Sequence, residues 1–292
     1  MTVGASIRPR VCALTMVYNE KFNLPRWVTY YGGQIGKENL LVIDNDSTDE
    51  SRDLIRSVPN LRYPRTGFCD IERSKFVSAL ASSLLLIYDY VIYTDSDEII
   101  IPDPERYTGI IDFLSKNPSD AHTCIGFNVF ERIGHDRPYD PGLPLLLQRK
   151  NAHFLISMCK TSIVAKPPSW SGGFHASNLE PNFSGLLLLH LKSAIIGYAK
   201  ERLQITRTLE WRTQTRAGAH QRISDEAFDE IMTTRAKHDP TPLTQEVIQE
   251  LAQRLRAGVK PIKRAQGDTL YQLEPPSGRW FVRLPEAYHQ LI

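Results

Sequence analysis

Short apolar runs alternate with amphipathic segments along the first hundred residues of the chain. Between the first two runs, Leu24, Trp27, Val28 and Tyr31 have the spacing of one helix face. The runs are rich in strand-forming residues and cover residues 11–17, 40–43, 61–63 and 91–93. Strand–helix alternation of this kind predicts an α/β fold with a mostly parallel sheet and helices on both faces.

Two further helices are expected between these strands. Ser47 to Glu50 has the S-x-x-E spacing of a capping box, which predicts a helix that begins there. Residues 71–87 form a long helical candidate. Its expected buried side carries Phe76, Leu80, Leu84 and Ile87.

Beyond residue 101 the pattern changes, and helices dominate towards the C-terminus. A helix is expected after Asp103, and residues 133–143 are rich in Gly, Pro and Asp, which is typical of a loop. Three more strands are expected at residues 124–131, 161–165 and 185–191, and a helix at 243–257. We therefore expect one domain over residues 1–195 and a helical extension over residues 196–292.

Polar residues follow three of the predicted strands at the point where each strand ends. They are Asn19-Glu20, Asp44-Asn45 and Asp95-Ser96-Asp97. The carboxyl ends of parallel strands meet at one edge of the sheet, where ligands of such folds bind. The sequence therefore predicts one site at this edge. For the Asp44–Asp46 segment two interpretations stay open, namely contact with a base or ribose and capping of the next helix.

The acidic segment at the end of the fourth run predicts a metal site. Asp95, Asp97 and Glu98 would repel one another beside so many apolar residues, and a bound Mg²⁺ or Mn²⁺ would remove that cost. Alternation along an extended chain would put Asp95 and Asp97 on one side. The alternative is a solvated acidic turn.

Other residues suit a site that holds a metal ion and a diphosphate. His190 ends a run of four leucines and could complete the metal site, with Lys192 on a phosphate; the alternative is a core histidine. Arg73 and Lys75 begin a helix, where cations and free N–H groups suit a diphosphate, although ordinary surface charge explains them equally well. Trp170 and His175 lie in a glycine-containing loop and are candidates for substrate contact.

Composition limits the classes of protein that need to be considered. The chain has 292 residues, 41 % of them hydrophobic, and a net charge of +2, so no nucleic-acid surface is indicated. The four cysteines form no CxxC pair, and no stretch resembles a signal peptide or a membrane span, which together favour the cytoplasm. The basic C-terminal segment could touch an anionic membrane or be a solvated helix face.

Four segments together resemble the metal-dependent GT-A glycosyltransferases. The segments VYNE, IDNDSTDES, DYVIYTDSDEII and LLLLHLKS occur in the order and spacing of that fold, and they are most similar to the family 2-like group with a D-x-D-E sequence. The resemblance covers about residues 10–195 and implies a Rossmann-like fold. It also implies hexosyl transfer from a nucleotide sugar, such as a UDP- or GDP-sugar, to a carbohydrate or lipid-linked acceptor.

The resemblance also implies roles for individual residues. Asp95 and Asp97 would hold Mn²⁺ or Mg²⁺ on the diphosphate, with His190 as the later ligand, and Lys192 would contact phosphate. In an inverting member a carboxylate deprotonates the acceptor hydroxyl. We choose Asp136 for that base over Glu131 and Asp140. The nucleotide pocket would be lined by Asn19, Glu20, Asp44 and Asn45.

Two other functions remain open from the sequence. A metal-dependent phosphohydrolase would use Asp95 as its nucleophile, although Ile99 stands where Thr or Val is expected and the motif comes late in the chain. A protein that binds sugar nucleotides without catalysis would need the same metal site and no base.

Overall fold

The computed structural model describes residues 8–65, 67–212, 218–264 and 267–292. Its first sheet has the strand order β3-β2-β1-β4-β9-β6, in which β3, β2, β1 and β4 are parallel and β9 and β6 are antiparallel to their neighbours. The parallel half is the one that the sequence predicts. The strands are β1 (Val11–Val17), β2 (Leu40–Asp44), β3 (Asn60–Arg62), β4 (Tyr90–Tyr93), β6 (Ala121–Thr123) and β9 (Thr161–Val164).

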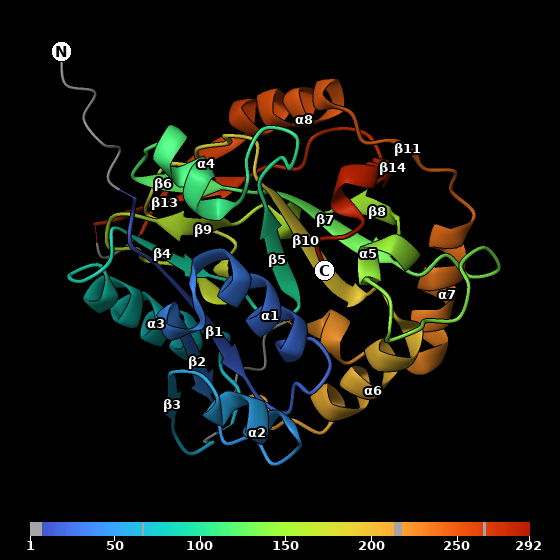
Figure 1. Cartoon of the computed structure of the whole chain (residues 1–292), viewed down its shortest axis with the longest axis horizontal. Helices are drawn as coiled ribbons and strands as arrows, with labels where there is room; N and C mark the ends of the chain where they lie inside the picture. Colours follow the sequence, from blue (N-terminus) through green and yellow to red (C-terminus); the bar gives the residue numbers. More distant parts are fainter. Residues whose placement is uncertain (1–7, 66, 213–217, 265–266) are drawn as a thin grey trace.

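Helices cover both faces of this sheet, as predicted (Figure 1). α1 (Leu24–Ile35) buries Trp27 and Tyr31 in the same core as Ala13 of β1. α3 (Asp70–Leu84) packs on the opposite face, in the core that contains Leu14. Neighbouring residues of β1 thus face different cores because side chains alternate along a strand.

A second sheet continues the fold, with the strand order β11-β14-β8-β7-β10-β5. β10 is parallel to β7 and antiparallel to β5, so this sheet is mixed. The whole is a mixed, Rossmann-like α/β fold, as predicted. The strands are β5 (Glu98–Ile101), β7 (Ile125–Phe130), β8 (Asn151–Phe154), β10 (Leu187–Ser193), β11 (Thr241–Pro242) and β14 (Phe281–Arg283), and two short helices, α4 (Ile110–Lys116) and α5 (Leu145–Gln148), lie in the connections.

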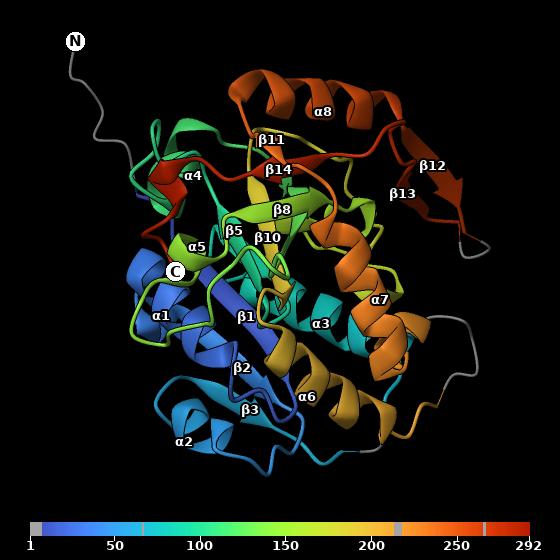
Figure 2. The ribbon, with the colours of Figure 1, turned by 90° about the vertical axis from the view of Figure 1, so that its right-hand side faces the viewer.

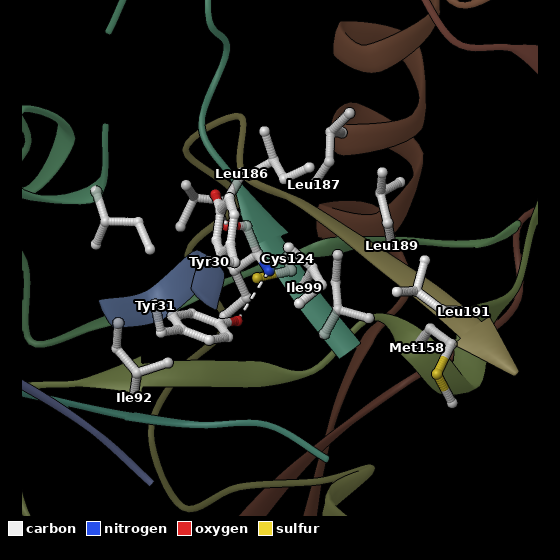
Figure 3. Close-up of a cluster of buried hydrophobic side chains, with 14 of the residues drawn as sticks. Tyr30, Tyr31, Ile92, Ile99, Cys124, Met158, Leu186, Leu187, Leu189 and Leu191 are labelled. Carbon is white, nitrogen blue, oxygen red and sulfur yellow. Dashed lines mark hydrogen bonds between the residues drawn. The ribbon is translucent and has the colours of Figure 1, made fainter. Parts of the chain in front are cut away.

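The main core lies where α1 meets the second sheet (Figure 3). Tyr30 Oη donates to the carbonyl of Ile100 at 2.7 Å, and the Ile100 amide donates to Tyr31 Oη at 2.9 Å. These bonds satisfy two buried hydroxyls and fix β5 beside α1. The acidic segment between β4 and β5 is therefore held at the junction of the two sheets.

Two expectations about helices were wrong in whole or in part. α2 (Ser51–Arg56) begins four residues after Ser47, which is buried and accepts a hydrogen bond from the Asn19 amide at 3.0 Å instead of capping a helix. The expected buried side of α3 is only partly right, because Leu80 and Leu84 pack against the core whereas Phe76 and Ile87 are exposed. The fully buried residues are Ser74, Val77, Ser78 and Ala81. Small side chains on this face admit the 170–174 segment close to the helix, since the Trp170 amide donates to Ser78 Oγ at 3.1 Å.

The prediction of a helical C-terminal extension was incomplete. The helix expected at residues 243–257 is present as part of a group of three, and four short strands accompany them, of which β14 pairs with β8 and joins the second sheet. Leu251, Leu255 and Val282 belong to the main core. The elements are α6 (Ile196–Arg207), α7 (Asp225–Ala236), α8 (Gln245–Ala257) and the hairpin of β12 (Val259–Lys263) with β13 (Thr269–Leu273). The domain boundary at residue 195 stays a prediction.

Within the described residues, no helix is long and apolar enough to cross a membrane. The four cysteines are free thiols, and Cys12, Cys124 and Cys159 are buried.

Candidate functional site

The three polar strand ends lie on adjacent parallel strands, as the sequence predicts. β1 is hydrogen-bonded to β2 on one side and to β4 on the other. Asn19 Oδ1 accepts from the Thr48 amide at 2.7 Å, and the Asn45 amide donates to the carbonyl of Val17 at 2.9 Å. Hydrogen bonds thus join the loops that follow β1 and β2 at the carboxyl edge of the sheet.

Backbone strain marks three loops of this region. Asn19, Asp46 and Phe174 have positive φ angles of 50°, 65° and 63°. Asn and Asp tolerate this conformation, but a buried Phe adopts it only when its surroundings require it. Phe174 packs on Tyr93 at a centroid distance of 4.2 Å, and the Arg73 guanidinium lies 5.1 Å from its ring centre. The 170–174 segment is therefore held tightly against the end of β4.

Two basic side chains of the protein lie next to Asp95. Its Oδ1 accepts from Arg73 and, at 3.1 Å, from the Tyr93 hydroxyl, and its Oδ2 lies 3.5 Å from Lys160 Nζ. Burial would raise the pKa of Asp95, but the charges of Arg73 and Lys160 lower it overall. Arg73 and Lys160 thus supply neutralising charge beside Asp95, and a role for Asp95 in metal binding stays a prediction.

Glu98 and Lys160 form a buried ion pair beside Asp95. Their side chains are 1 % and 4 % exposed. Glu98 Oε1 accepts from Lys160 Nζ, and Oε2 accepts from the Asp95 amide at 3.2 Å. Burial raises the pKa of Glu98 above its usual value despite the neighbouring cation. The hydrogen bond from the Glu98 amide to the carbonyl of Asp95, at 2.9 Å, closes a turn over residues 95–98. The expected extended backbone, with both aspartates on one side, was therefore wrong.

Asp97 and His190 meet as the sequence predicts, since His190 Nε2 lies 3.2 Å from Asp97 Oδ2. His190 Nδ1 is 2.8 Å from Asn128 Oδ1, which leaves Nε2 directed at the acid. Burial would raise the pKa of Asp97, but His190, Lys192 and Lys160 together lower it. Asp97 thus offers a negatively charged oxygen next to an imidazole whose orientation is fixed by Asn128.

These residues fit a divalent cation. Asp97, Glu98 and His190 each offer one ligand atom, and the three atoms lie within 4.8 Å of one another. Two carboxylates and an imidazole suit Mn²⁺ or Mg²⁺. Compared with the expected set of Asp95, Asp97 and His190, the structure places Glu98 in the position expected of Asp95.

A small pocket of about 20 Å³, room for about one water molecule, lies next to Asp97, between the strand ends and α6. Its charged lining consists of Glu20, Lys192 and Arg202 in addition to Asp97. Burial lowers the pKa of Lys192 to about 8 and raises that of Glu20, the latter despite nearby Arg202. Arg202 also donates to the carbonyls of Tyr18 and Asn19 at 2.7 and 2.9 Å. One helix of the C-terminal part therefore helps to build the candidate site.

The other predicted nucleotide-binding residues have partners of their own. Asp44 Oδ1 accepts from the Ser47 amide at 2.8 Å, and Asn45 Oδ1 accepts from Arg65 at 2.9 Å. Lys75 is exposed on α3, away from the inward-facing Arg73. Their roles in nucleotide binding stay predictions.

The predicted base and the two predicted substrate contacts lie outside the pocket. Trp170 is buried, packs on Tyr93 and donates its indole N–H to the carbonyl of Thr161 at 2.9 Å. His175 is exposed, with Nδ1 2.9 Å from the carbonyl of Ser157. Asp136 accepts from the Arg132 amide at 2.7 Å within its own turn. Whether any of the three touches substrate stays a prediction.

Four residues of the site were missed from the sequence: Lys160, Asn128, Tyr198 and Arg202. Lys160 could have been found from its position immediately before the buried strand β9, because a buried lysine requires an acidic partner. Asn128 is a polar residue inside an apolar strand, and such a residue must bond to something. Tyr198 and Arg202 carry no such signal, because α6 has an ordinary surface composition.

No family model and no curated protein matches the chain. Two solved structures are similar to it in part. One is a mycobacterial protein, with 12 % identity and a TM-score of 0.33 over 95 % of this chain and 87 % of the other. The second is a mannose-1-phosphate geranyltransferase from Thermus thermophilus, with 11 % identity and a TM-score of 0.29 over 94 % of this chain and 74 % of the other. At this level of similarity neither bears on the function of the chain.

Proposed function

We propose that the protein is a metal-dependent glycosyltransferase that moves a sugar from a nucleoside-diphosphate sugar to a carbohydrate or lipid-linked acceptor. The observation that carries this proposal is the group of Asp97, Glu98 and His190 at the carboxyl edge of the parallel strands. Beside it lies a pocket with Glu20, Lys192 and Arg202. Acidic metal ligands next to basic side chains suit a diphosphate that carries its own cation.

Asp97, Glu98 and His190 would hold the Mn²⁺ or Mg²⁺. When bound, the cation offsets the negative charge that develops on the departing nucleoside diphosphate. Lys192 adds a positive charge from β10 and faces the same pocket. Its lowered pKa of about 8 still leaves the amine mostly protonated at neutral pH, so it can bind a phosphate oxygen.

α6 supports the site from its other side. Tyr198 stacks on Phe22 at a centroid distance of 3.9 Å, and both line the pocket next to Asp97. This aromatic pair limits the access of water, which would otherwise hydrolyse the donor. Arg202 ties α6 to the loop after β1 through two carbonyls and through Glu20 Oε2 at 3.5 Å.

The general base that we propose is Glu20, in place of Asp136. Glu20 lines the same pocket as Asp97, whereas Asp136 lies outside it. Glu20 itself accepts from the Asn23 amide at 3.3 Å and lies 3.5 Å from Arg202. Burial raises the pKa of Glu20, which makes its carboxylate a stronger base. It would accept the proton of the acceptor hydroxyl at one carboxylate oxygen.

Thermal unfolding with UDP, GDP and their sugar conjugates, with and without Mn²⁺, tests the proposal. We expect a donor to raise the melting temperature only with the metal, and Asp97→Asn to abolish this shift and the transfer of sugar. Asp120→Asn is the matched control, because Asp120 is exposed and pairs only with Lys166. Stabilisation by a nucleotide sugar that is equal with and without metal, or unchanged in Asp97→Asn, would contradict the proposal.

The two alternatives predict other outcomes of the same experiments. A phosphohydrolase with Asp95 as nucleophile would release phosphate without any acceptor, but both oxygens of Asp95 already face cations. A binding protein would show the metal-dependent shift and no turnover. Glu20→Gln tests the proposed base, because it should abolish sugar transfer and leave the metal-dependent shift of the melting temperature in place.

A further inference from the structure

A second pocket is lined by residues of α7, β8 and the segment that leads into β14. These elements are labelled in Figure 2. Its volume is about 470 Å³, which is enough for a small molecule. Apolar and planar side chains form much of its wall. Its apolar and planar lining includes Phe154, Ile231, Phe281, Trp280, His153 and His238. Its charged lining consists of Arg235, Arg279 and the exposed Glu230.

The aromatic wall of the pocket is ordered by stacking. Phe281 lies between two imidazoles, with its ring centre 4.1 Å from that of His238 and 5.7 Å from that of His153. The ring planes are inclined by 18° and 26°. Flat, nearly parallel rings favour a planar ligand, which can stack in the same way.

Two buried polar atoms in this wall lack a partner among the described residues. They are the indole Nε1 of Trp280 and Nδ1 of His153. The other three tryptophans donate their indole N–H, to Thr94 Oγ1, the Thr161 carbonyl and the Thr206 carbonyl. A buried donor without an acceptor costs free energy, which sets Trp280 apart from the other three tryptophans.

Arg235 of α7 brings a positive charge to the same pocket. Its Nη1 is 3.2 Å from Ser193 Oγ, and no carboxylate of the described residues forms an ion pair with it. Burial lowers the pKa of Arg235 to about 10, so the side chain stays charged at neutral pH. A guanidinium without a carboxylate partner among the described residues suits an anionic oxygen.

A row of side chains connects this pocket with the candidate metal site. On one face of the second sheet, Glu98 pairs with His190, His190 with Asn128, Asn128 with His153, and His153 with Phe281. Paired residues on neighbouring strands point to the same face. Asn128 Nδ2 also lies 3.4 Å from Ser193 Oγ, the hydroxyl that Arg235 contacts.

We propose that this pocket is a second ligand site, for a small molecule with a planar apolar body and a carboxylate or phosphate group. The planar body lies against the aromatic wall of the pocket, which includes Trp280, and the anionic group pairs with Arg235. The proposal does not depend on the proposed function, because it involves none of the metal ligands.

Titration of the full chain, followed by ¹H–¹⁵N NMR of the four indole N–H groups, tests the proposal. The probes are 2-naphthoate, 2-naphthyl phosphate, the neutral 2-naphthylmethanol and inorganic phosphate. We expect one of the two aromatic anions to shift the Trp280 signal saturably and to leave the signals of Trp27, Trp170 and Trp211 in place. The tighter of the two identifies the anionic group.

Variants of the basic residue complete the test. Arg235→Met should weaken binding of the aromatic anion by about tenfold or more, and Arg235→Lys by less. Arg283→Met is the matched control and should change nothing, since Arg283 is exposed and outside the pocket lining. The three other indole signals report whether each variant is folded. Equal binding of the neutral probe, shifts of all four signals or no saturable shift would each overturn the proposal.

Discussion

At the scale of single residues, the ion pair of Glu98 and Lys160 decides how the acidic segment is tolerated. Both side chains are almost completely buried, and Lys160 Nζ also lies 3.5 Å from Asp95 Oδ2. Lys160 therefore faces two carboxylates, of which Asp95 also has Arg73 as a partner. Burial disfavours each charge separately, so the pair is stable only while both signs are present.

Replacing Lys160 by Met should destabilise the fold by about 3 to 5 kcal/mol, because the buried carboxylate of Glu98 then loses its cation. The measurement is urea unfolding at neutral pH. The double variant Lys160→Met with Glu98→Gln is the control and should recover part of the loss, since no buried charge is then left alone. Lys166→Met, at an exposed pair with Asp120, should change stability by less than about 1 kcal/mol. Equal losses in the two lysine variants would contradict the prediction.

The sequence predicted those parts of the site that have a local signal in the chain. Acids at strand ends and a histidine at the end of a leucine run pointed to Asp97 and His190, which lie 3.2 Å apart. The partners of Asp95 could not be predicted in this way. Lys160 and Arg73 approach it from positions 65 residues later and 22 residues earlier, and such long-range pairs leave no periodic signal.

At the scale of elements, α3 shows where hydrophobic pattern misleads. The sequence predicts that Phe76 and Ile87 face the core, but both are exposed, and the buried face carries Ser74, Ser78 and Ala81. The 170–174 segment comes close to this face, where large side chains would not fit. Close approach of two backbones selects small residues, which a search for apolar spacing does not recognise.

Ser78→Ala should cost about 1 to 3 kcal/mol, because the buried amide of Trp170 then loses its acceptor. Ser83→Ala is a matched control on the same helix. Both hydroxyls donate to a carbonyl four residues earlier, but only Ser78 also accepts from another segment. Ser83 is exposed, and its loss should stay within about 0.5 kcal/mol. Thermal unfolding of the two variants measures the difference, and similar melting temperatures would count against the assigned bond.

At the scale of the whole molecule, the first 195 residues and the remainder share a core. Leu251 and Leu255 of α8 and Val282 of β14 belong to the same cluster as Trp27 of α1. β14 extends the second sheet at β8, and Arg202 of α6 bonds the loop after β1. Helical spacing over residues 243–257 predicted α8 correctly, but a periodic pattern does not say which core a helix joins.

This shared core implies that the chain unfolds as one unit. Leu251 is fully buried, so Leu251→Ala should destabilise the protein by about 2 to 5 kcal/mol, whereas Gln253→Ala, on the exposed side of α8, should stay within about 0.5 kcal/mol. Hydrogen exchange of the amides of β1, β10 and α8 in both variants measures the effect. Because a common core couples the two parts, β1 should lose as much protection as α8 itself. If Leu251→Ala weakened α8 and left β1 unchanged, residues 196–292 would instead be a separate folding unit.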